Sequence, residues 1–152
     1  MNEHEPYMQR CLELGQQSMN LGNSPVGAVL VKDGKIIGEG LELAKTHNDI
    51  TYHAEVEAIR DALKNTGAKK LEGTLLYTTH EPCLLCSYAI RHYRIAAVYF
   101  GLSTGDIGGH SSDFKLLATD KVSSWQEAPQ VQGGIMKKDC EVLQQAFLKK
   151  HQ

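Results

Sequence analysis

Apolar residues recur at the spacing of an amphipathic α-helix in several segments of the chain. The first segment begins at Pro6, after two acidic residues, and ends before Gly22 and Asn23, which predicts a helix over 6–20. The same spacing predicts further helices over residues 53–66, 82–93 and 139–150, the last capped by Asp139, and a short helix around Phe114, Leu116 and Leu117. Each long helix has one apolar face and therefore needs a partner layer.

Runs rich in β-branched and aromatic residues lie between these helices and predict the strands of a sheet. They cover residues 25–31, 36–40, 74–79, 96–100 and 130–133. The first two runs flank Asp33 and Gly34, a pair that favours a tight hairpin turn and makes these strands antiparallel. The third and fourth runs flank a predicted helix, an order typical of a parallel crossover. The sequence therefore predicts a mixed, layered α/β fold.

The composition is that of an ordinary globular protein. Of 152 residues, 41% are hydrophobic and 22% are charged, so a single domain over 1–152 is expected. The chain has 16 Lys and Arg against 18 Asp and Glu, so it carries no overall basic excess to attract nucleic acid. Its N-terminus lacks the apolar core of a signal peptide, and no apolar run is long enough to cross a bilayer. A cytoplasmic location without membrane attachment is expected.

The strongest chemical signal is a pair of short motifs at the predicted starts of two helices. His53 and Glu55 stand in one first turn, and Cys83 and Cys86 stand in the other. Two thiolates and one imidazole suit tetrahedral Zn²⁺ and leave its fourth position open for water. A helix start also lowers the pKa of a thiol toward the thiolate that zinc requires. Glu55 points roughly 200° around the helix from His53, so it is free to carry protons instead of binding the metal.

Two other interpretations of the cysteine pair are a structural zinc knuckle and a thioredoxin-like redox pair. A knuckle would draw on a second cysteine pair, but Cys11 and Cys140 lie in apolar helical stripes and are expected to be small buried hydrophobes. Neither interpretation needs a histidine and a glutamate at a separate helix start. A third hypothesis is a binding or regulatory module without turnover, although every metal donor and the proton carrier are present.

The chain resembles the cytidine-deaminase superfamily, and more closely its branch of bacterial tRNA adenosine deaminases and small guanine deaminases. Three motifs carry the resemblance: Pro-Val-Gly-Ala-Val at 25–29, His-Ala-Glu at 53–55 and Glu-Pro-Cys-Leu-Leu-Cys at 81–86. The resemblance implies a three-layer α/β/α sandwich with a mixed sheet of about five strands. It also implies a homodimer.

The resemblance further implies one Zn²⁺ per subunit, bound by His53, Cys83 and Cys86. Glu55 would take a proton from the attacking water, deliver it to a ring nitrogen and help protonate the amine that leaves as ammonia. Such hydrolysis needs no other cofactor. The same motifs supply expected substrate contacts, which are Val26, Ala54 and Pro82.

The choice of substrate depends on positions outside these motifs. Relatives commonly place an Asn that contacts the base eleven residues before the ligand histidine, where this chain has Glu42. A buried, ionised carboxylate accepts hydrogen bonds and donates none, so Glu42 favours a ring that presents N–H groups, as guanine does. The alternative is a solvated loop carboxylate. His80, at the end of the third strand, is a second candidate contact.

We therefore expect hydrolysis of a C–N bond in a small cyclic amidine. The expected substrate is an amino-substituted nucleobase or nucleoside, with a guanine-like purine favoured and a cytosine-like ring as a further option. The alternative is a tRNA-specific adenosine deaminase that makes inosine at the anticodon wobble position, which would need a basic surface. Four lysines cluster near the C-terminal helix, but lysine at a helix end more often only compensates the helix dipole in solvent. They are Lys137, Lys138, Lys149 and Lys150.

Overall fold

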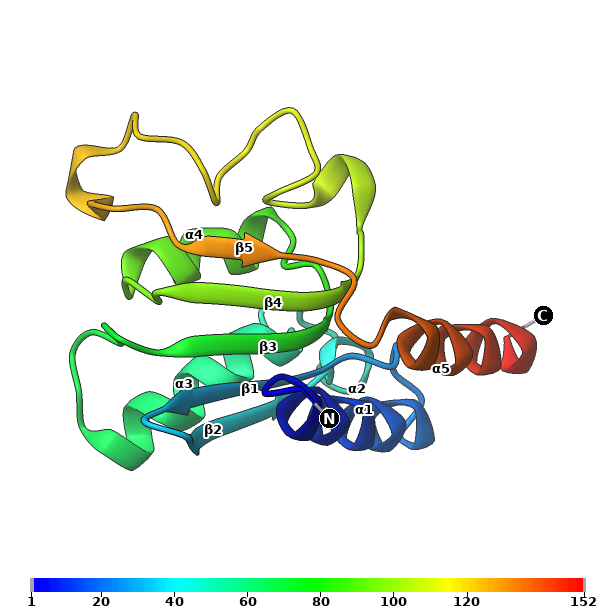
Figure 1. Cartoon of the computed structure of the whole chain (residues 1–152). Helices are drawn as coiled ribbons and strands as arrows, with labels where there is room; N and C mark the ends of the chain where they lie inside the picture. Colours follow the sequence, from blue (N-terminus) through cyan, green and yellow to red (C-terminus); the bar gives the residue numbers. More distant parts are fainter. Residues whose placement is uncertain (1, 152) are drawn as a thin grey trace.

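A computed structural model describes residues 2–151 and shows a twisted sheet with helices on both of its faces (Figure 1). The strands are β1 (Gly27–Lys32), β2 (Lys35–Leu41), β3 (Leu75–His80), β4 (Ala97–Leu102) and β5 (Gln130–Gln132). The helices are α1 (Glu5–Asn20), α2 (Ala44–His47), α3 (Ala54–Thr66), α4 (Leu84–His92) and α5 (Lys137–Lys150), with short 3-10 turns η1 (Gly105–Ile107) and η2 (Ser123–Trp125).

The sheet is mixed, as the sequence predicts. Its five strands lie in the order β2-β1-β3-β4-β5. β1 pairs antiparallel with both β2 and β3, whereas β3, β4 and β5 run parallel to one another. The hairpin between β1 and β2 turns through Asp33 and Gly34, whose φ angles of 51° and 76° are those of a primed turn. The predicted crossover, β3-α4-β4, is present, and because β3 and β4 are parallel, their carboxyl ends lie side by side.

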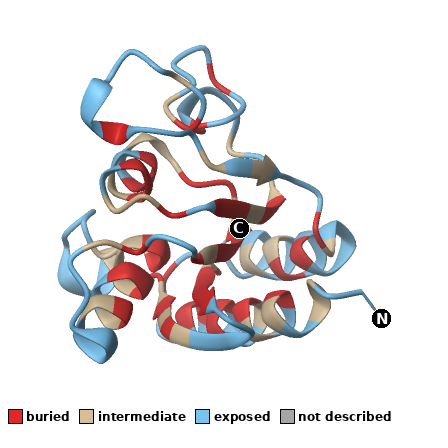
Figure 2. Cartoon of the chain, turned by 60° about the vertical axis from the view of Figure 1, so that its left-hand side comes forward, coloured by how far each residue is buried: buried red, intermediate tan, exposed pale blue. Residues whose placement is uncertain are grey.

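Alternating side chains of β1 build the two halves of the core. Ala28 and Leu30 pack into a cluster with α3 and α4, while Val29 and Val31 pack on the opposite face with α1 and α5. Figure 2 shows buried residues along the strands and on the sheet-facing sides of the helices. The expected three-layer α/β/α sandwich is thereby confirmed. Within residues 2–151, none of the helices has the length and apolar character that a bilayer crossing requires.

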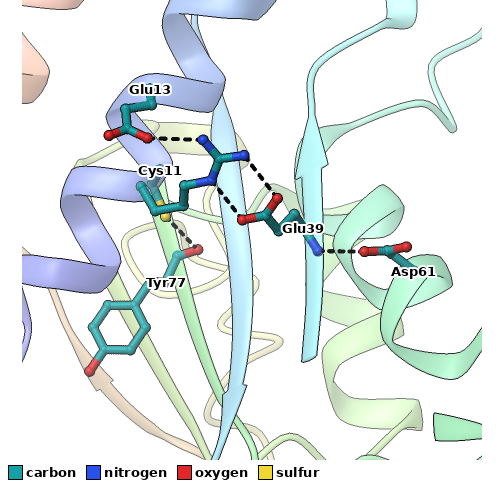
Figure 3. A network of polar contacts seen from close by, with 6 residues as sticks. Cys11, Glu13, Glu39, Asp61 and Tyr77 are labelled. Atoms are coloured by element: carbon teal, nitrogen blue, oxygen red, sulfur yellow. Dashed lines mark hydrogen bonds and ion pairs between the residues drawn. The ribbon is translucent and has the colours of Figure 1, made fainter. Parts of the chain in front are cut away.

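A polar network ties α1, β2 and α3 together at one end of the sheet (Figure 3). The Arg10 guanidinium donates to both carboxylate oxygens of Glu39, at 2.6 Å and 3.0 Å, and to Glu13 at 2.9 Å. The backbone N–H of Glu39 donates to the Asp61 carboxylate at 2.9 Å. The Arg10 guanidinium lowers the pKa of Glu39, so the carboxylate is held in its charged form. This network fixes α3 against the edge strand β2.

Helix α3 approaches β2 so closely that only glycine fits at Gly40. A Cβ atom placed there would lie 2.1 Å from the Ala54 carbonyl oxygen and 2.4 Å from the Ala58 nitrogen. Both contacts are with backbone atoms of α3, so they cannot be relieved by turning a side chain. Gly40 therefore determines how close the first turn of α3, which carries His53 and Glu55, lies to the sheet.

We expect Gly40→Ala to lower the free energy of unfolding by roughly 1–3 kcal/mol, because α3 must shift away from β2. In a thermal melt, this corresponds to a fall in Tm of several degrees. Lys35→Ala, at an exposed position of the same strand, should leave Tm nearly unchanged. A melt of Gly40→Ala that coincides with that of the unchanged protein would show that the helix tolerates the extra methyl group.

Helix starts differ from the predicted ones at several places. α5 begins at Lys137, and Asp139 lies in its first turn and not at its cap, which is Met136 in a left-handed conformation. The expectation that Asp139 caps this helix was therefore wrong. The polar stretch before His53 also contains a short helix, α2, that apolar spacing did not reveal because none of its residues is buried.

The short helix predicted around Phe114, Leu116 and Leu117 is absent. Lys115 has a φ of 47°, which interrupts a right-handed helix. The Leu116 carbonyl accepts a hydrogen bond at 2.8 Å from the buried Arg91 guanidinium, which anchors this segment to α4. Of the three apolar residues, Leu117 is buried, whereas the Phe114 side chain is 65% exposed. The apolar spacing reflected a single anchoring residue and not a helical face.

Candidate active site

The two motifs meet where α3 and α4 begin, on the same face of the sheet. His53 is the N-cap of α3 and Cys83 is the N-cap of α4, and both have extended backbones. The prediction placed both residues inside the first turn and let Pro82 begin the helix, which is wrong by one or two residues. The reason is that the Pro82 carbonyl accepts the Gly109 N–H at 2.9 Å, so a neighbouring loop holds Pro82 outside α4.

The three donor atoms lie at the spacing that a tetrahedral zinc ion imposes. Cys83 Sγ and Cys86 Sγ are 3.7 Å apart, and His53 Nδ1 lies 3.4 Å and 3.5 Å from them. Zinc–sulfur bonds of about 2.3 Å and a zinc–nitrogen bond of about 2.0 Å at tetrahedral angles give sulfur–sulfur and sulfur–nitrogen separations of about 3.8 Å and about 3.5 Å. His53, Cys83 and Cys86 are positioned to bind a metal, and zinc fits their donor set.

The electrostatics of these donors favour a thiolate. Hydrogen bonding from the Cys86 thiol, together with His53, lowers the pKa of Cys83 to about 4. The same contact raises the pKa of Cys86, which holds the shared proton, and the Cys83 thiolate raises the pKa of His53 to about 9. One thiolate is thus ready for a cation, and metal binding releases the protons that remain on the other two donors.

Glu55 lies beside the donor cluster in the same pocket. Its side chain is only 4% exposed, and burial raises the pKa of its carboxyl to about 8. A carboxyl group that titrates near neutral pH can both take up and release a proton during a reaction. Glu55 therefore has the environment of a general acid and base, on the helix that also presents His53.

The pocket has a volume of about 380 Å³ and opens from the donor cluster to the surface. It is lined by Ser24, Val26, Glu42, Ala44, His53, Glu55, His80, Glu81, Cys83, Thr104, Ile107 and Gln144. Of the expected substrate contacts, Val26, Glu42 and His80 belong to this lining. Ala54 and Pro82 are buried next to the metal-binding residues and lie outside the lining, as does the fully buried Cys86.

In this lining, Glu42 accepts a hydrogen bond, whereas His80 donates one. The Glu42 side chain is 8% exposed and accepts the Ala44 N–H at 3.1 Å, and burial raises the pKa of its carboxyl. Burial lowers the pKa of His80, whose Nε2–H donates to Gln144 Oε1 at 3.0 Å. Glu42 is therefore a buried hydrogen-bond acceptor and not a solvated loop carboxylate. Gln144 comes from the C-terminal helix, where the sequence pattern gave no sign of a pocket residue.

The fold, the His-Cys-Cys donor set and a buried glutamate beside it define the class of zinc-dependent hydrolytic deaminases. Residues 1–102 match the family model of the cytidine and deoxycytidylate deaminase zinc-binding region, and the chain belongs to this family. The predicted family resemblance, the deaminase activity and the zinc cofactor are confirmed by this match together with the geometry of the donor set.

Relatives of two kinds are similar to this chain. A tRNA-specific adenosine deaminase from Streptococcus pyogenes is 34% identical over 149 residues, which cover 98% of this chain and 92% of the relative. A guanine deaminase from Bacillus subtilis is 40% identical over 129 residues, covering 83% of each chain. A solved structure from a study of A-to-I editing by tRNA:A34 deaminases superimposes with a TM-score of 0.84 at 30% identity, covering 91% of this chain and 99% of that one.

Proposed function

We propose that this protein hydrolyses the exocyclic amino group of a small, guanine-like purine to a carbonyl group and ammonia. The observation that carries the proposal is the buried Glu42 carboxylate, which shares a pocket with Glu55 and the donor cluster. An acceptor in this position suits a ring edge that presents N–H groups. The volume of about 380 Å³ is sufficient for a purine ring.

The residues of the pocket divide the work of this reaction. Bound zinc supplies a Lewis acid that activates water for attack on the amino-bearing ring carbon. Glu55 takes a first proton from the attacking water and transfers it to the adjacent ring nitrogen. It then takes the second proton from the new hydroxyl group on the tetrahedral carbon and passes it to the amine, so the C–N bond breaks, the carbonyl forms and ammonia leaves. His53, Cys83 and Cys86 hold the metal, one ion per chain. Glu42 orients the base from the side of the pocket.

The charge of the pocket supports a neutral small molecule over a polyanion. Among residues 2–151, none of those lining the pocket is Lys or Arg. Phosphate contacts, which provide most of the affinity for nucleic acid, would therefore have to come from residues outside this lining. The three carboxyl side chains in the lining, Glu42, Glu55 and Glu81, add no positive charge that would attract a phosphate.

A second candidate is deamination of adenosine within tRNA. The specific support for it is the tRNA-specific adenosine deaminase from Streptococcus pyogenes, which matches 98% of this chain. The pocket is also open at the surface, so that a base flipped out of a strand has access.

One assay separates these candidates: ammonia release by the zinc-loaded protein with guanine, guanosine, adenine, adenosine, cytosine, cytidine and a tRNA anticodon stem-loop. We expect turnover of guanine or a close amino-purine, and none of the stem-loop. Turnover of the stem-loop alone would replace the first proposal by the second. Release from none of the substrates, by protein with a full zinc content, would contradict both.

We expect Glu42→Gln to lower kcat/KM for guanine about tenfold relative to adenine, because the amide replaces one acceptor oxygen by a donor that opposes the N–H edge of guanine. Steady-state ammonia release with both bases measures the ratio. Asp49→Asn, in the exposed part of the same connection, is the matched control and should leave the ratio unchanged. The same ranking of substrates in Glu42→Gln and the unchanged protein would show that Glu42 does not read the base.

The proposal includes a homodimer. Apolar side chains on α4 support it, because Leu85 and Tyr88 are 38% and 57% exposed on this helix. Sedimentation velocity should give twice the mass of the 16.8 kDa chain. A monomer at micromolar concentration would contradict this part of the proposal.

A further inference from the structure

A fully buried carboxylate at the end of β3 holds the loop that forms one wall of the pocket. Glu81 is 1% exposed, and residues 103–111, here called the pocket loop, wrap around its two oxygens. Five donors reach this carboxylate, and all of them belong to the pocket loop. They are the Ser103 hydroxyl at 3.1 Å, the Thr104 N–H at 3.0 Å, the His110 N–H at 2.9 Å, and the N–H and hydroxyl of Ser111 at 2.7 Å and 2.8 Å.

These contacts leave Glu81 no capacity for substrate. A carboxylate has about four lone-pair sites, and five donors already share them. Within residues 2–151, no ion pair involves Glu81, so the loop donors alone balance its charge. Glu81 therefore differs from Glu42 and Glu55, which face the same pocket with acceptor capacity to spare.

The pocket loop lies directly on the carboxylate. A Cβ atom at Gly108 would lie 2.1 Å from Glu81 Oε2, so this glycine is required for a close approach and not for an unusual φ. Gly108 also pairs with the metal-binding Cys83 in an isolated β-bridge. Thr104 and Ile107 of the loop line the pocket. The loop is thus a wall whose position depends on Glu81.

We propose that Glu81 is a positioning residue that keeps the pocket loop closed against the substrate, an inference that rests on the proposed deaminase function. Charge-assisted hydrogen bonds of this kind are about twice as strong as neutral ones, and here the accepting carboxylate is itself buried. Without them, the loop spends part of its time in open arrangements in which Thr104 and Ile107 do not contact the base. Substrate binding must then close the loop, which weakens the apparent affinity.

Glu81→Gln tests this role, because it keeps the size of the side chain and turns one acceptor into a donor that faces other donors. We expect KM to rise about tenfold while kcat stays within about twofold, because the loop is closed again once substrate is bound. Zinc content should remain one ion per chain. Backbone amide exchange of residues 103–111, followed by mass spectrometry without substrate, should become faster.

A variant on the loop side separates this role from an effect on the metal. Ser103→Ala with Ser111→Ala removes two hydroxyl donors and leaves Glu81, Pro82 and Cys83 intact. We expect a smaller rise in KM, about threefold, in the same direction. Asp106→Asn, an exposed carboxylate in the same loop, is the matched control and should change neither KM nor exchange.

Two outcomes would overturn the proposal. Loss of zinc and of kcat in Glu81→Gln, with an unchanged KM in the double serine variant, would mean that Glu81 acts through Cys83. Unchanged exchange and unchanged KM in both variants would mean that the loop holds itself. Because zinc content and exchange are measured without substrate, they test the anchoring even if the substrate panel favours tRNA over a free base.

Discussion

Replacing Glu55 by glutamine should lower deamination roughly 10³-fold or more while leaving the zinc content unchanged. The amide keeps the shape of the side chain in its buried position, but it cannot accept a proton from water or pass one to the ring. Glu55 acts in both of these proton-transfer steps, so we expect kcat to fall, and not only KM to rise. The steady-state rate of ammonia release at saturating substrate, normalised to bound zinc, measures kcat directly.

Glu57→Gln is the matched control for this experiment. It makes the same chemical change two residues further along α3, where the side chain pairs with Arg60 outside the pocket. We expect it to retain full turnover. Glu55→Gln with more than a tenth of normal activity would show that another group moves the proton, and loss of zinc in this variant would show that Glu55 supports the metal instead.

The sheet and its covering helices could be predicted from the sequence because their signals are local. Alternation along β1 sends Val29 and Leu30 to opposite faces, and the Asp33-Gly34 pair fixes the hairpin. The segment between β4 and β5 could not be predicted in this way. Its course depends on Arg91, which lies in α4 and donates to carbonyl groups far along the chain. Long-range anchoring leaves no periodic pattern to read.

The same distinction applies to the site. The donor cluster was predictable because His53, Cys83 and Cys86 carry specific chemistry at short spacings. Gln144 was missed because it reaches His80 across 64 positions of the sequence, from a helix that shows only a narrow apolar stripe. The sequence identifies Glu81 only as the first residue of the motif at 81–86. Its contacts with the pocket loop could not be predicted, because its five hydrogen bonds depend on how that distant loop folds.

Removing the metal should also have a large effect on turnover, and Cys83→Ser is the most direct way to remove it. A serine hydroxyl stays protonated at neutral pH, so the site loses one of its two thiolates and much of its affinity for zinc. We expect bound zinc to fall well below one ion per chain and ammonia release to fall roughly 100-fold or more. Zinc is measured by atomic emission on protein passed through a desalting column.

Cys11→Ser serves as the control for this change. Cys11 is buried on the opposite face of the sheet and donates to the Tyr77 carbonyl at 3.3 Å, a hydrogen bond that a serine hydroxyl can replace. This variant should keep its zinc and its turnover. Chelation of the unchanged protein should abolish turnover, and added zinc should restore it, whereas Cys83→Ser should not recover at the same zinc concentration. Full activity of Cys83→Ser after desalting would mean that the reaction does not depend on this cluster.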